Sequence, residues 1–386
     1  MKKICFITTV SITMKSFVVE TAKYLHEKLG YDVTLICNPD AEFETSLPEY
    51  LHFIPVEMAR GVSLSGFKAI GVFRKIFRAR KFDMVQYSTP NASLYASLAG
   101  KLAGIKIRIY SQCGIRYVSF VGVKRLIFKT VEKLTCALST HVRGQSPKNM
   151  QFAIDEGLCP KKKISVVGIG GTIGVELDKC REFDHEAKKA ELRAKYGIPE
   201  DAFVYGYVGR INVDKGINEL IEAFKIISSE KTNAYLALVG MLDDVNPIKE
   251  ENLEYARECK NIVMTGNVPK DEVYHHMSMF DVLTHPTYRE GFGKVLQEAM
   301  GVGLPIITTN APGPSEVVED GISGVLCEVK NSQDLADKMR ALYEDPAMRD
   351  RIAKASLARA EKYFDRPIML ENIRKDMEEL VGSERG

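Results

Sequence analysis

Two glutamates flank a glycine-rich turn in the second half of the sequence. Glu290 comes directly before the Gly-Phe-Gly run at 291–293, and Glu298 lies about two turns into the helix expected from Lys294. Each carboxylate can accept two hydroxyl hydrogen bonds, so the vicinal hydroxyls of a sugar or ribose are natural partners. Glycines let a ligand approach the backbone, and the first turn of a helix offers N–H groups to phosphate oxygens. Taken alone, Glu298 is explained by a solvated helix face and Glu290 by an ion pair with Arg289. Taken together with the turn, the two glutamates predict a ligand-binding site.

Two cations follow a strand expected over residues 203–208. Arg210 comes directly after Gly209, and Lys215 precedes a helix expected from Gly216. In open α/β sheets, ligands bind at the carboxyl ends of the strands. This position favours contact with phosphate groups over the alternative of two ordinary surface charges. Two cations suit a diphosphate leaving group, because negative charge grows on it as the bond to it breaks.

These segments resemble the retaining, family-four nucleotide-sugar glycosyltransferases. The family signature is two glutamates separated by seven residues, often written E-G-F-G-x-x-x-x-E, and Glu290 to Glu298 matches it. The similarity continues downstream at 303–307 and 313–316, and upstream at 207–210 and 215–216. It covers most of residues 1–380 and is densest in the second half.

The resemblance implies the GT-B fold, in which two Rossmann-like doubly wound parallel-sheet domains face each other across a cleft. It implies that Arg210 and Lys215 neutralise the donor diphosphate, that Glu298 binds the ribose, and that Glu290 holds the donor sugar. Glu290, Arg210 and Lys215 are the implied catalytic residues. The base is expected near 267–269, where backbone groups can read its edge. The implied donor-binding residues are Gly209, Arg210, Lys215, Asn267, Val268, Glu290, Gly291, Phe292, Gly293, Lys294, Val295 and Glu298.

The first half departs from the family pattern. Many members have a glycine-rich first loop with a nearby histidine, and residues 8–16 contain neither. Many also place His or Glu before a glycine after a later strand, where this chain has Cys113. The expected acceptor-binding residues are Gln112, Cys113 and Arg116, with Cys113 a small buried residue rather than a nucleophile. No catalytic residue is assigned in this half.

The sequence offers no obvious metal site. Metal-dependent transferases usually hold their cation with a D-x-D carboxylate pair, and none occurs here. Asp243 and Asp244 are adjacent in a polar loop and are expected to be solvated. His275 and His276 have no carboxylate or cysteine at metal-ligand spacing and are expected on a helix surface. We therefore expect a metal-independent reaction without a cofactor, in which Arg210 and Lys215 take the place of the cation.

Length and composition describe an ordinary globular protein. The 386 residues suggest two domains, and an apolar content of 45% with 27% charged residues excludes disorder, collagen and coiled coil for the whole chain. Eight cysteines without a CxxC pair favour the reduced thiols of the cytosol over a zinc ribbon or disulfide scaffold. No apolar run reaches the ~18–20 residues of a membrane span. The short apolar run at 4–7 predicts a first strand rather than a signal peptide.

Charge divides the chain unevenly. Residues 1–175 hold 25 Lys and Arg against 12 Asp and Glu, a net +13, and the remainder has a net −11. In the helix expected over 64–81, basic residues lie toward one face and apolar residues share another, which suits an anionic membrane surface. The alternative is a core-facing helix with a solvated basic face. The apolar residues expected as membrane insertion points are Phe73, Ile76 and Phe77.

Apolar runs alternate with helical patterns along the whole chain, which predicts parallel α/β sheets. The expected strands are 4–8, 33–37, 51–55, 84–87, 105–110, 203–208, 234–239, 261–265, 282–285 and 305–308. The expected helices are 17–29, 64–81, 92–102, 124–138, 216–228, 294–301, 332–343, 347–363 and 368–380. The predicted domains are an acceptor-binding domain (1–177), a nucleotide-sugar-binding domain (178–364) and a C-terminal helix (365–386) that packs back on the first domain. The polar stretch 178–191 is expected to form the linker.

Together, the motifs and the resemblance imply a retaining glycosyltransferase at the cytoplasmic face of the cell membrane. It would move a hexosyl or N-acetylhexosaminyl group from a nucleotide diphosphate sugar, expected to be a UDP-sugar, to a lipid-linked or polysaccharide glycan, such as one on polyprenyl diphosphate. The alternatives are a nucleotide-sugar epimerase or phosphorylase of the same fold, and a nucleotide-sugar-binding protein without catalysis. Nothing in the sequence favours nucleic-acid binding. The donor sugar, acceptor, linkage and oligomeric state are left open.

Overall fold

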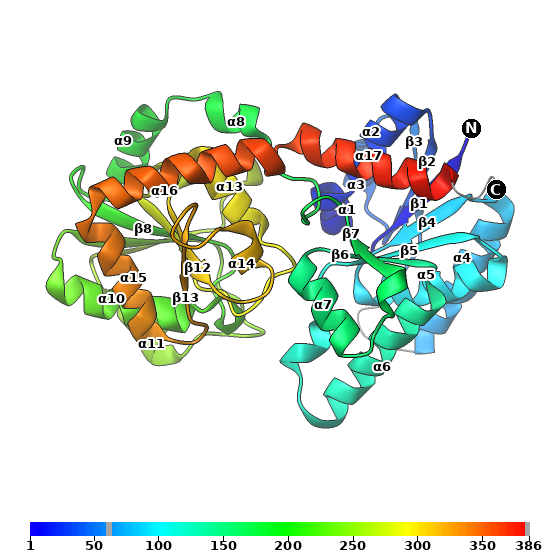
Figure 1. Cartoon of the computed structure of the whole chain (residues 1–386), viewed down its shortest axis with the longest axis horizontal. Helices are drawn as coiled ribbons and strands as arrows, with labels where there is room; N and C mark the ends of the chain where they lie inside the picture. Colours follow the sequence, from blue (N-terminus) through cyan, green and yellow to red (C-terminus); the bar gives the residue numbers. More distant parts are fainter. Residues whose placement is uncertain (59–63, 383–386) are drawn as a thin grey trace. The chain divides into compact units, whose positions relative to one another are not determined.

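The computed structural model describes residues 1–58 and 64–382 and divides into two compact units (Figure 1). Unit 1 comprises Met1–Ile173 together with Pro367–Gly386, and unit 2 comprises Gly174–Arg366. The chain therefore crosses from unit 1 to unit 2 and back. The crossings lie at 173/174 and 366/367, close to the expected boundaries at 177/178 and 364/365. The binding roles given to the two domains stay predictions.

Unit 1 is built on a seven-stranded parallel sheet with the order β3-β2-β1-β4-β5-β6-β7. Its strands are β1 (Lys3–Ile7), β2 (Asp32–Cys37), β3 (Leu51–Pro55), β4 (Met84–Tyr87), β5 (Ile107–Gln112), β6 (His141–Gly144) and β7 (Ile164–Val166). Its helices are α1 (Ser11–Phe17), α2 (Val19–Leu29), α3 (Ala41–Thr45), α4 (Leu64–Arg80), α5 (Pro90–Ala103), α6 (Gly122–Leu138), α7 (Pro147–Asp155) and α17 (Arg366–Gly382). The short strands β6 and β7 were not expected, because His141 and Arg143 leave β6 without a continuous apolar run and β7 has only three residues.

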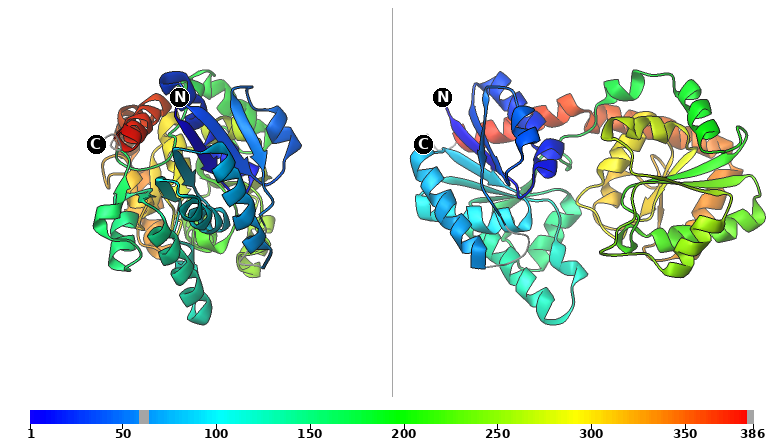
Figure 2. Two further views of the ribbon diagram at one scale, coloured as in Figure 1. Left: turned by 90° about the vertical axis from the view of Figure 1, so that its right-hand side faces the viewer. Right: turned by 180° about the vertical axis from the view of Figure 1, so that it is seen from behind.

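Helices cover both faces of this sheet and bury separate apolar clusters (Figure 2). One cluster joins residues of α4, α5 and α6 to one face. The other joins α1 and α2 to the opposite face, and it includes Met377 and Val381 of α17. The C-terminal helix thus completes the core of unit 1, although it follows all of unit 2 in the sequence.

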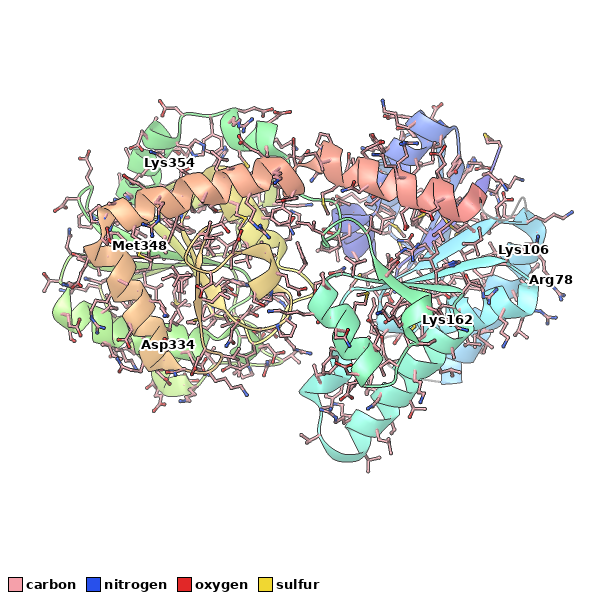
Figure 3. The ribbon with its side chains drawn as sticks, in the orientation of Figure 1. Arg78, Lys106, Lys162, Asp334, Met348 and Lys354 are labelled. Atoms are coloured by element: carbon pink, nitrogen blue, oxygen red, sulfur yellow. The ribbon has the colours of Figure 1, made fainter. Side chains whose placement is uncertain are left out.

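The apolar face of α4 is part of the protein core. Phe73 and Phe77 are completely buried, and Ile76 packs against the same cluster. The prediction that these three residues insert into a membrane is therefore wrong, and the alternative of a core-facing helix holds. The basic residues of α4 are exposed, and Arg78 points outward (Figure 3).

Unit 2 contains a six-stranded parallel sheet with the order β10-β9-β8-β11-β12-β13. Its strands are β8 (Phe203–Val208), β9 (Ala234–Val239), β10 (Ile262–Gly266), β11 (Val282–His285), β12 (Ile306–Thr309) and β13 (Val325–Cys327). Its helices are α8 (Leu177–Arg181), α9 (His185–Lys195), α10 (Ile217–Glu230), α11 (Glu250–Glu258), α12 (Val273–Ser278), α13 (Lys294–Val302), α14 (Pro314–Val317), α15 (Ser332–Glu344) and α16 (Pro346–Arg359).

The polar stretch 178–191 does not form a linker. It folds as α8 and α9 of unit 2, and Asp184 caps the start of α9 by accepting hydrogen bonds from the backbone N–H groups of Glu186 and Ala187. Each helix buries only a few side chains, such as Cys180 and Leu192. So narrow an apolar stripe in a charged segment gives a weak helical signal in the sequence.

Both sheets are doubly wound, with a point at which the strand order reverses. In unit 2 this point lies between β8 and β11, which pair in parallel. Ligands of open α/β sheets bind outside the carboxyl ends of the strands at such a point. The loops that follow Val208 and His285 are therefore the place to look for a site.

Candidate active site

The loops after β8 and β11 are in direct contact. Gly216 has φ +70°, and a Cβ atom at this position would lie 2.0 Å from the carbonyl oxygen of Pro286. Only glycine allows both this backbone conformation and this approach. The contact brings the β8 loop, which carries Gly209, Arg210 and Lys215, beside the β11 loop, which carries Glu290.

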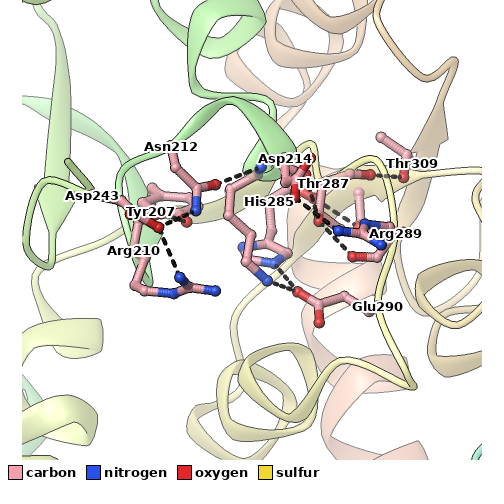
Figure 4. A network of polar contacts seen from close by, with 12 residues as sticks. Tyr207, Arg210, Asn212, Asp214, Asp243, His285, Thr287, Arg289, Glu290 and Thr309 are labelled. Carbon is pink, nitrogen blue, oxygen red and sulfur yellow. Dashed lines mark hydrogen bonds and ion pairs between the residues drawn. The ribbon is translucent and has the colours of Figure 1, made fainter. Parts of the chain in front are cut away.

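The side chains of Lys215 and Glu290 meet in an ion pair between the lysine Nζ and the glutamate Oε1 (Figure 4). The buried His285 places its Nε2 3.2 Å from the same carboxylate oxygen. The ion pair with Arg289 considered from the sequence does not form, because Arg289 pairs with Asp214 at 2.9 Å. Glu290 is thus held from two sides by residues of both loops.

This environment keeps Glu290 ionised. Burial raises the pKa of the Glu290 carboxyl, but the positive charge of Lys215 and the hydrogen bond from His285 outweigh it and set the pKa at about 2. Burial lowers the pKa of His285, so its ring is neutral at neutral pH. A carboxylate only accepts hydrogen bonds, so the proton of the neutral ring is on Nε2. The unprotonated Nδ1 is buried without a hydrogen-bond partner, and the ring stacks on Tyr207 with centroids 5.3 Å apart.

Arg210 belongs to an adjoining network. Its side chain is 66% exposed, and its Nη1 lies 2.7 Å from Oδ2 of Asp243. Asn212 donates to the same oxygen at 2.9 Å and accepts from the backbone N–H of Lys215 at 3.1 Å. The Asp243 side chain is 9% exposed and accepts hydrogen bonds from Arg210 and Asn212, so the expectation that it is solvated is wrong. Asn212 was not predicted as a site residue. Its position in the sequence between Arg210 and Lys215 could have indicated that it belongs to the same loop network.

The helix after the glycine turn begins at the predicted residue. Gly293 is the N-cap of α13 with φ +100°, a conformation that favours glycine. Glu298 forms an ion pair with Lys294 one turn earlier on the same helix, and Val295 is half-buried. Phe292 is buried, and its ring contacts Phe364 edge to face with centroids 5.7 Å apart. The Phe292 side chain therefore packs in the protein core.

A second glycine loop supports the backbone at Glu290. Gly313 has φ +92°, and a Cβ atom there would lie 2.6 Å from the carbonyl oxygen of Glu290. The Glu316 carboxylate accepts from the Gly313 N–H at 3.0 Å, which fixes this loop.

The predicted donor residues fall into three groups. The structure brings Lys215 and Glu290 together directly, and Asn212 connects the Lys215 backbone to the Arg210 network. Gly291 to Glu298 lie on the β11 loop and α13. Asn267 and Val268 follow β10, which β9 separates from β8 in the sheet. All three groups lie after the carboxyl ends of strands.

In unit 1, a cavity of about 100 Å³ is present near the carboxyl ends of β4 to β6, lined among others by Ser88, Cys113 and Gln145. Cys113 is exposed, so the expectation that it is buried is wrong. The Gln112 side chain is buried and donates to Glu132 at 2.7 Å. The side chain of Arg116 is outside the described part of the structure.

The two adjacent histidines lie on α12. His276 is buried, with Nδ1 2.9 Å from the Glu272 carbonyl and Nε2 3.1 Å from the Tyr196 hydroxyl, so its expected place on the surface is wrong. His275 is half-buried against Phe183. Within residues 1–58 and 64–382, no three or more His, Cys, Asp or Glu side chains form a group that could hold a metal ion.

Comparisons with known proteins agree with this geometry. The family described as glycosyl transferases group 1 matches residues 188–359, and glycosyl transferase 4-like matches residues 3–146. The capsular polysaccharide biosynthesis glycosyltransferase CapM of Staphylococcus aureus is 32% identical over 90% of this chain and 89% of its own. N,N'-diacetylbacillosaminyl-diphospho-undecaprenol alpha-1,3-N-acetylgalactosaminyltransferase of Campylobacter jejuni is 24% identical over 86% and 87%.

Among solved structures, Anabaena HepE in complex with UDP superimposes with a TM-score of 0.79 at 20% identity, over 98% of this chain and 99% of that one. This likeness identifies the GT-B architecture for the two doubly wound sheets. The two family matches and the similarity to CapM along most of both chains establish the family. The protein belongs to the group 1 glycosyltransferases, as its paired glutamates predicted.

Proposed function

We propose that the protein is a retaining, metal-independent glycosyltransferase that moves a hexosyl or N-acetylhexosaminyl group from a UDP-sugar to a lipid-linked or polysaccharide glycan. The observation that carries this proposal is the ionised Glu290 carboxylate, held by Lys215 and His285 where β8 and β11 end. The relatives support the substrate classes. CapM is named for capsular polysaccharide biosynthesis, the Campylobacter enzyme for a diphospho-undecaprenol acceptor, and HepE was crystallised with UDP.

In this proposal, the donor diphosphate binds beside Lys215 and Arg210. The exposed Arg210 guanidinium can reach a ligand, and Lys215 can share its charge between Glu290 and a phosphate oxygen. Both cations counter the charge that grows on the diphosphate as the glycosidic bond breaks. The Glu290 carboxylate accepts hydrogen bonds from hydroxyls of the donor sugar, and Glu298 accepts those of the ribose. The base contacts the backbone near Asn267 and Val268.

The configuration at the anomeric carbon is retained if the acceptor attacks this carbon on the face from which the diphosphate leaves. The acceptor oxygen forms a bond to the anomeric carbon as the bond to the diphosphate oxygen breaks, and the acceptor proton passes to that departing oxygen. No protein nucleophile is required. Metal independence is supported by the two cations at the site and by Asp243, whose carboxylate is engaged by Arg210 and Asn212.

We place the acceptor at unit 1, with Gln112, Cys113 and Arg116 as the proposed contacts. Cys113 lines the unit 1 cavity, which supports its part in this assignment. We further propose that the enzyme works at the cytoplasmic face of the cell membrane, because the first 175 residues carry a net charge of +13. None of the described helices is both long and apolar enough to span a bilayer.

The test is turnover with radiolabelled UDP-sugars and a lipid extract that contains polyprenyl-diphosphate glycans, followed by NMR of the new glycosidic bond. We expect label in the lipid fraction, an unchanged anomeric configuration and full activity in EDTA. Glu290→Ala should nearly abolish the incorporation. A UDP-sugar returned as its epimer, or binding without turnover for every donor tested, would contradict the proposal.

A further inference from the structure

The start of α6 exposes an unusual set of apolar side chains. Fifteen large apolar side chains are exposed in the described part of the chain, and four of them fall within residues 121–127, which we name the α6 tip. Their exposed fractions are 86% for Val121, 74% for Val123, 66% for Leu126 and 51% for Ile127. Clustered exposed apolar side chains mark an interaction surface more often than scattered ones do.

The two ends of α6 differ in their packing. Glu132, Thr135, Cys136 and Leu138 are buried in the second half of the helix, which fastens it to unit 1. Figures 1 and 2 show the first half extending beyond the sheet of this unit. Phe128 packs on Phe120, with ring centroids 4.8 Å apart. The tip is thus presented on a helix that is anchored at its other end.

The tip and the helix turns that follow it carry an excess of positive charge. Lys124 and Arg125 lie among the apolar residues, and Lys129 and Lys133 follow on the same helix. The single acidic residue of α6, Glu132, is buried and accepts hydrogen bonds from Tyr110 and Gln112. The carboxylate of Glu156, which follows α7, lies 2.6 Å from the Lys129 Nζ and 3.9 Å from Nη2 of Arg125. Four cations against this one carboxylate leave the first part of α6 with a net positive charge beside its exposed apolar side chains.

This combination selects among possible partners. A second copy of the tip would bring like charges together, which opposes self-association through this surface. An anionic bilayer offers both phosphates for Lys124 and Arg125 and an apolar layer directly beneath them. Long basic side chains can keep their charge among the headgroups while neighbouring apolar side chains enter the acyl boundary.

We propose that the α6 tip inserts into the surface of an anionic lipid bilayer, with Leu126 and Ile127 as its main apolar contacts. The inference deepens the proposed function, because it gives the surface by which unit 1 reaches a lipid-linked acceptor. It replaces the apolar face of α4, which is buried. The exposed basic residues of α4 can add only electrostatic attraction.

The first experiment is co-sedimentation of the full chain with vesicles made of equal parts phosphatidylglycerol and phosphatidylethanolamine. Replacing both Leu126 and Ile127 by serine should lower partitioning at least about tenfold at low and at high salt, because apolar burial is not screened. Replacing Lys124 and Arg125 by glutamate should lower it mainly at low salt. Leu102→Ser, at an exposed leucine of α5, is the matched control and should bind like the wild type.

The second experiment reports the location directly. The chain contains no tryptophan, so Leu126→Trp introduces a single fluorophore at the tip. Its emission should shift to shorter wavelength with anionic vesicles and stay unchanged with pure phosphatidylcholine, and Leu102→Trp should not respond to either. The proposal is overturned if the Leu126→Trp emission does not shift, or if the double serine variant sediments like the wild type. It is also overturned if that variant converts a dimer to a monomer, since the tip would then contact a second copy.

Transfer to a water-soluble acceptor separates this proposal from the proposed function. The double serine variant should keep wild-type turnover on a short-chain acceptor, because its substitutions lie outside the donor site. Loss of vesicle binding with retained turnover supports the proposal. Absence of turnover in the wild type would count against the proposed function and would leave the vesicle result standing.

Discussion

Removing the positive charge of Lys215 should make the enzyme sensitive to acid. In the wild type, the Glu290 pKa lies at about 2, against an ordinary value of 4.5. Burial alone would raise it, and Lys215 provides the largest contribution that lowers it. In Lys215→Met the burial remains and the largest contribution that opposes it is lost. The pKa of Glu290 should then rise to about its ordinary value or above it.

The size of the effect follows from the shift. At about 1.4 kcal/mol per pKa unit, lowering the pKa from 4.5 to about 2 corresponds to roughly 3 kcal/mol in favour of the ionised form. In the wild type, this stabilisation is fully present above the ordinary pKa and is lost as the pH falls from 4.5 toward 2. The wild-type carboxylate is therefore ionised over the whole range in which an enzyme is usually assayed.

The assay is kcat/KM for the nucleotide sugar, which reports the ionisation of the free enzyme, measured from about pH 4.5 to pH 8. The wild type should show no acid limb from Glu290 in this range. Lys215→Met should lose about 10²–10³-fold at neutral pH, as expected for one transition-state charge contact. It should lose further activity as the pH falls toward 5.

Lys294→Met is the matched control, because Lys294 also pairs with a glutamate of the proposed donor site, Glu298. It should weaken donor binding without a new acid limb. Parallel pH profiles for Lys215→Met and the wild type would refute the reasoning. So would a wild-type acid limb centred near pH 4.5, because Glu290 would then have an ordinary pKa.

Four further predictions rest on other parts of the structure. Glu290→Ala should lower transfer at least about a hundredfold and change UDP affinity by less than about threefold in calorimetry, because its proposed contact is with the sugar. EDTA should leave the initial rate unchanged, and a loss of activity restored by Mn²⁺ would contradict this. Gly216→Ala should cost about 2–4 kcal/mol in urea unfolding, since strain adds to a clash with Pro286, whereas Gly30→Ala, which has open space, should cost about 1 kcal/mol. Phe73→Ala should cost about 3–5 kcal/mol, and an effect under 1 kcal/mol would contradict its burial.

The sequence predicted most strands and helices because their periodicity is strong. Strands 51–55, 84–87, 203–208, 234–239 and 282–285 have the predicted bounds. Strands β7 and β13 were missed because three residues give little periodicity to detect, and β6 was missed because His141 and Arg143 interrupt its apolar residues. The buried face of α4 could not be assigned from its amphipathic pattern, since a core and a membrane select the same apolar spacing.

The residues of the candidate site could be proposed from the sequence, but their contacts could not. Glycines and paired glutamates identify the loop after β11 because their spacing is local in the sequence. The pairing of Lys215 with Glu290 joins residues 75 positions apart, and it depends on how the β8 and β11 loops meet at Gly216. The role of His285 was missed for a different reason. It lies only five residues before Glu290, but it ends a buried strand and looks like a core residue in the sequence.

The path of the chain also has a consequence for biosynthesis. Met377 and Val381 of α17 complete the core of unit 1, yet the ribosome makes them after all of unit 2. During synthesis, unit 2 has all of its residues before unit 1 does, which reverses the usual order in which the first domain folds first. Nascent unit 1 therefore exposes the apolar residues that Met377 and Val381 later cover, and any factor that protects growing chains would find its binding surface there.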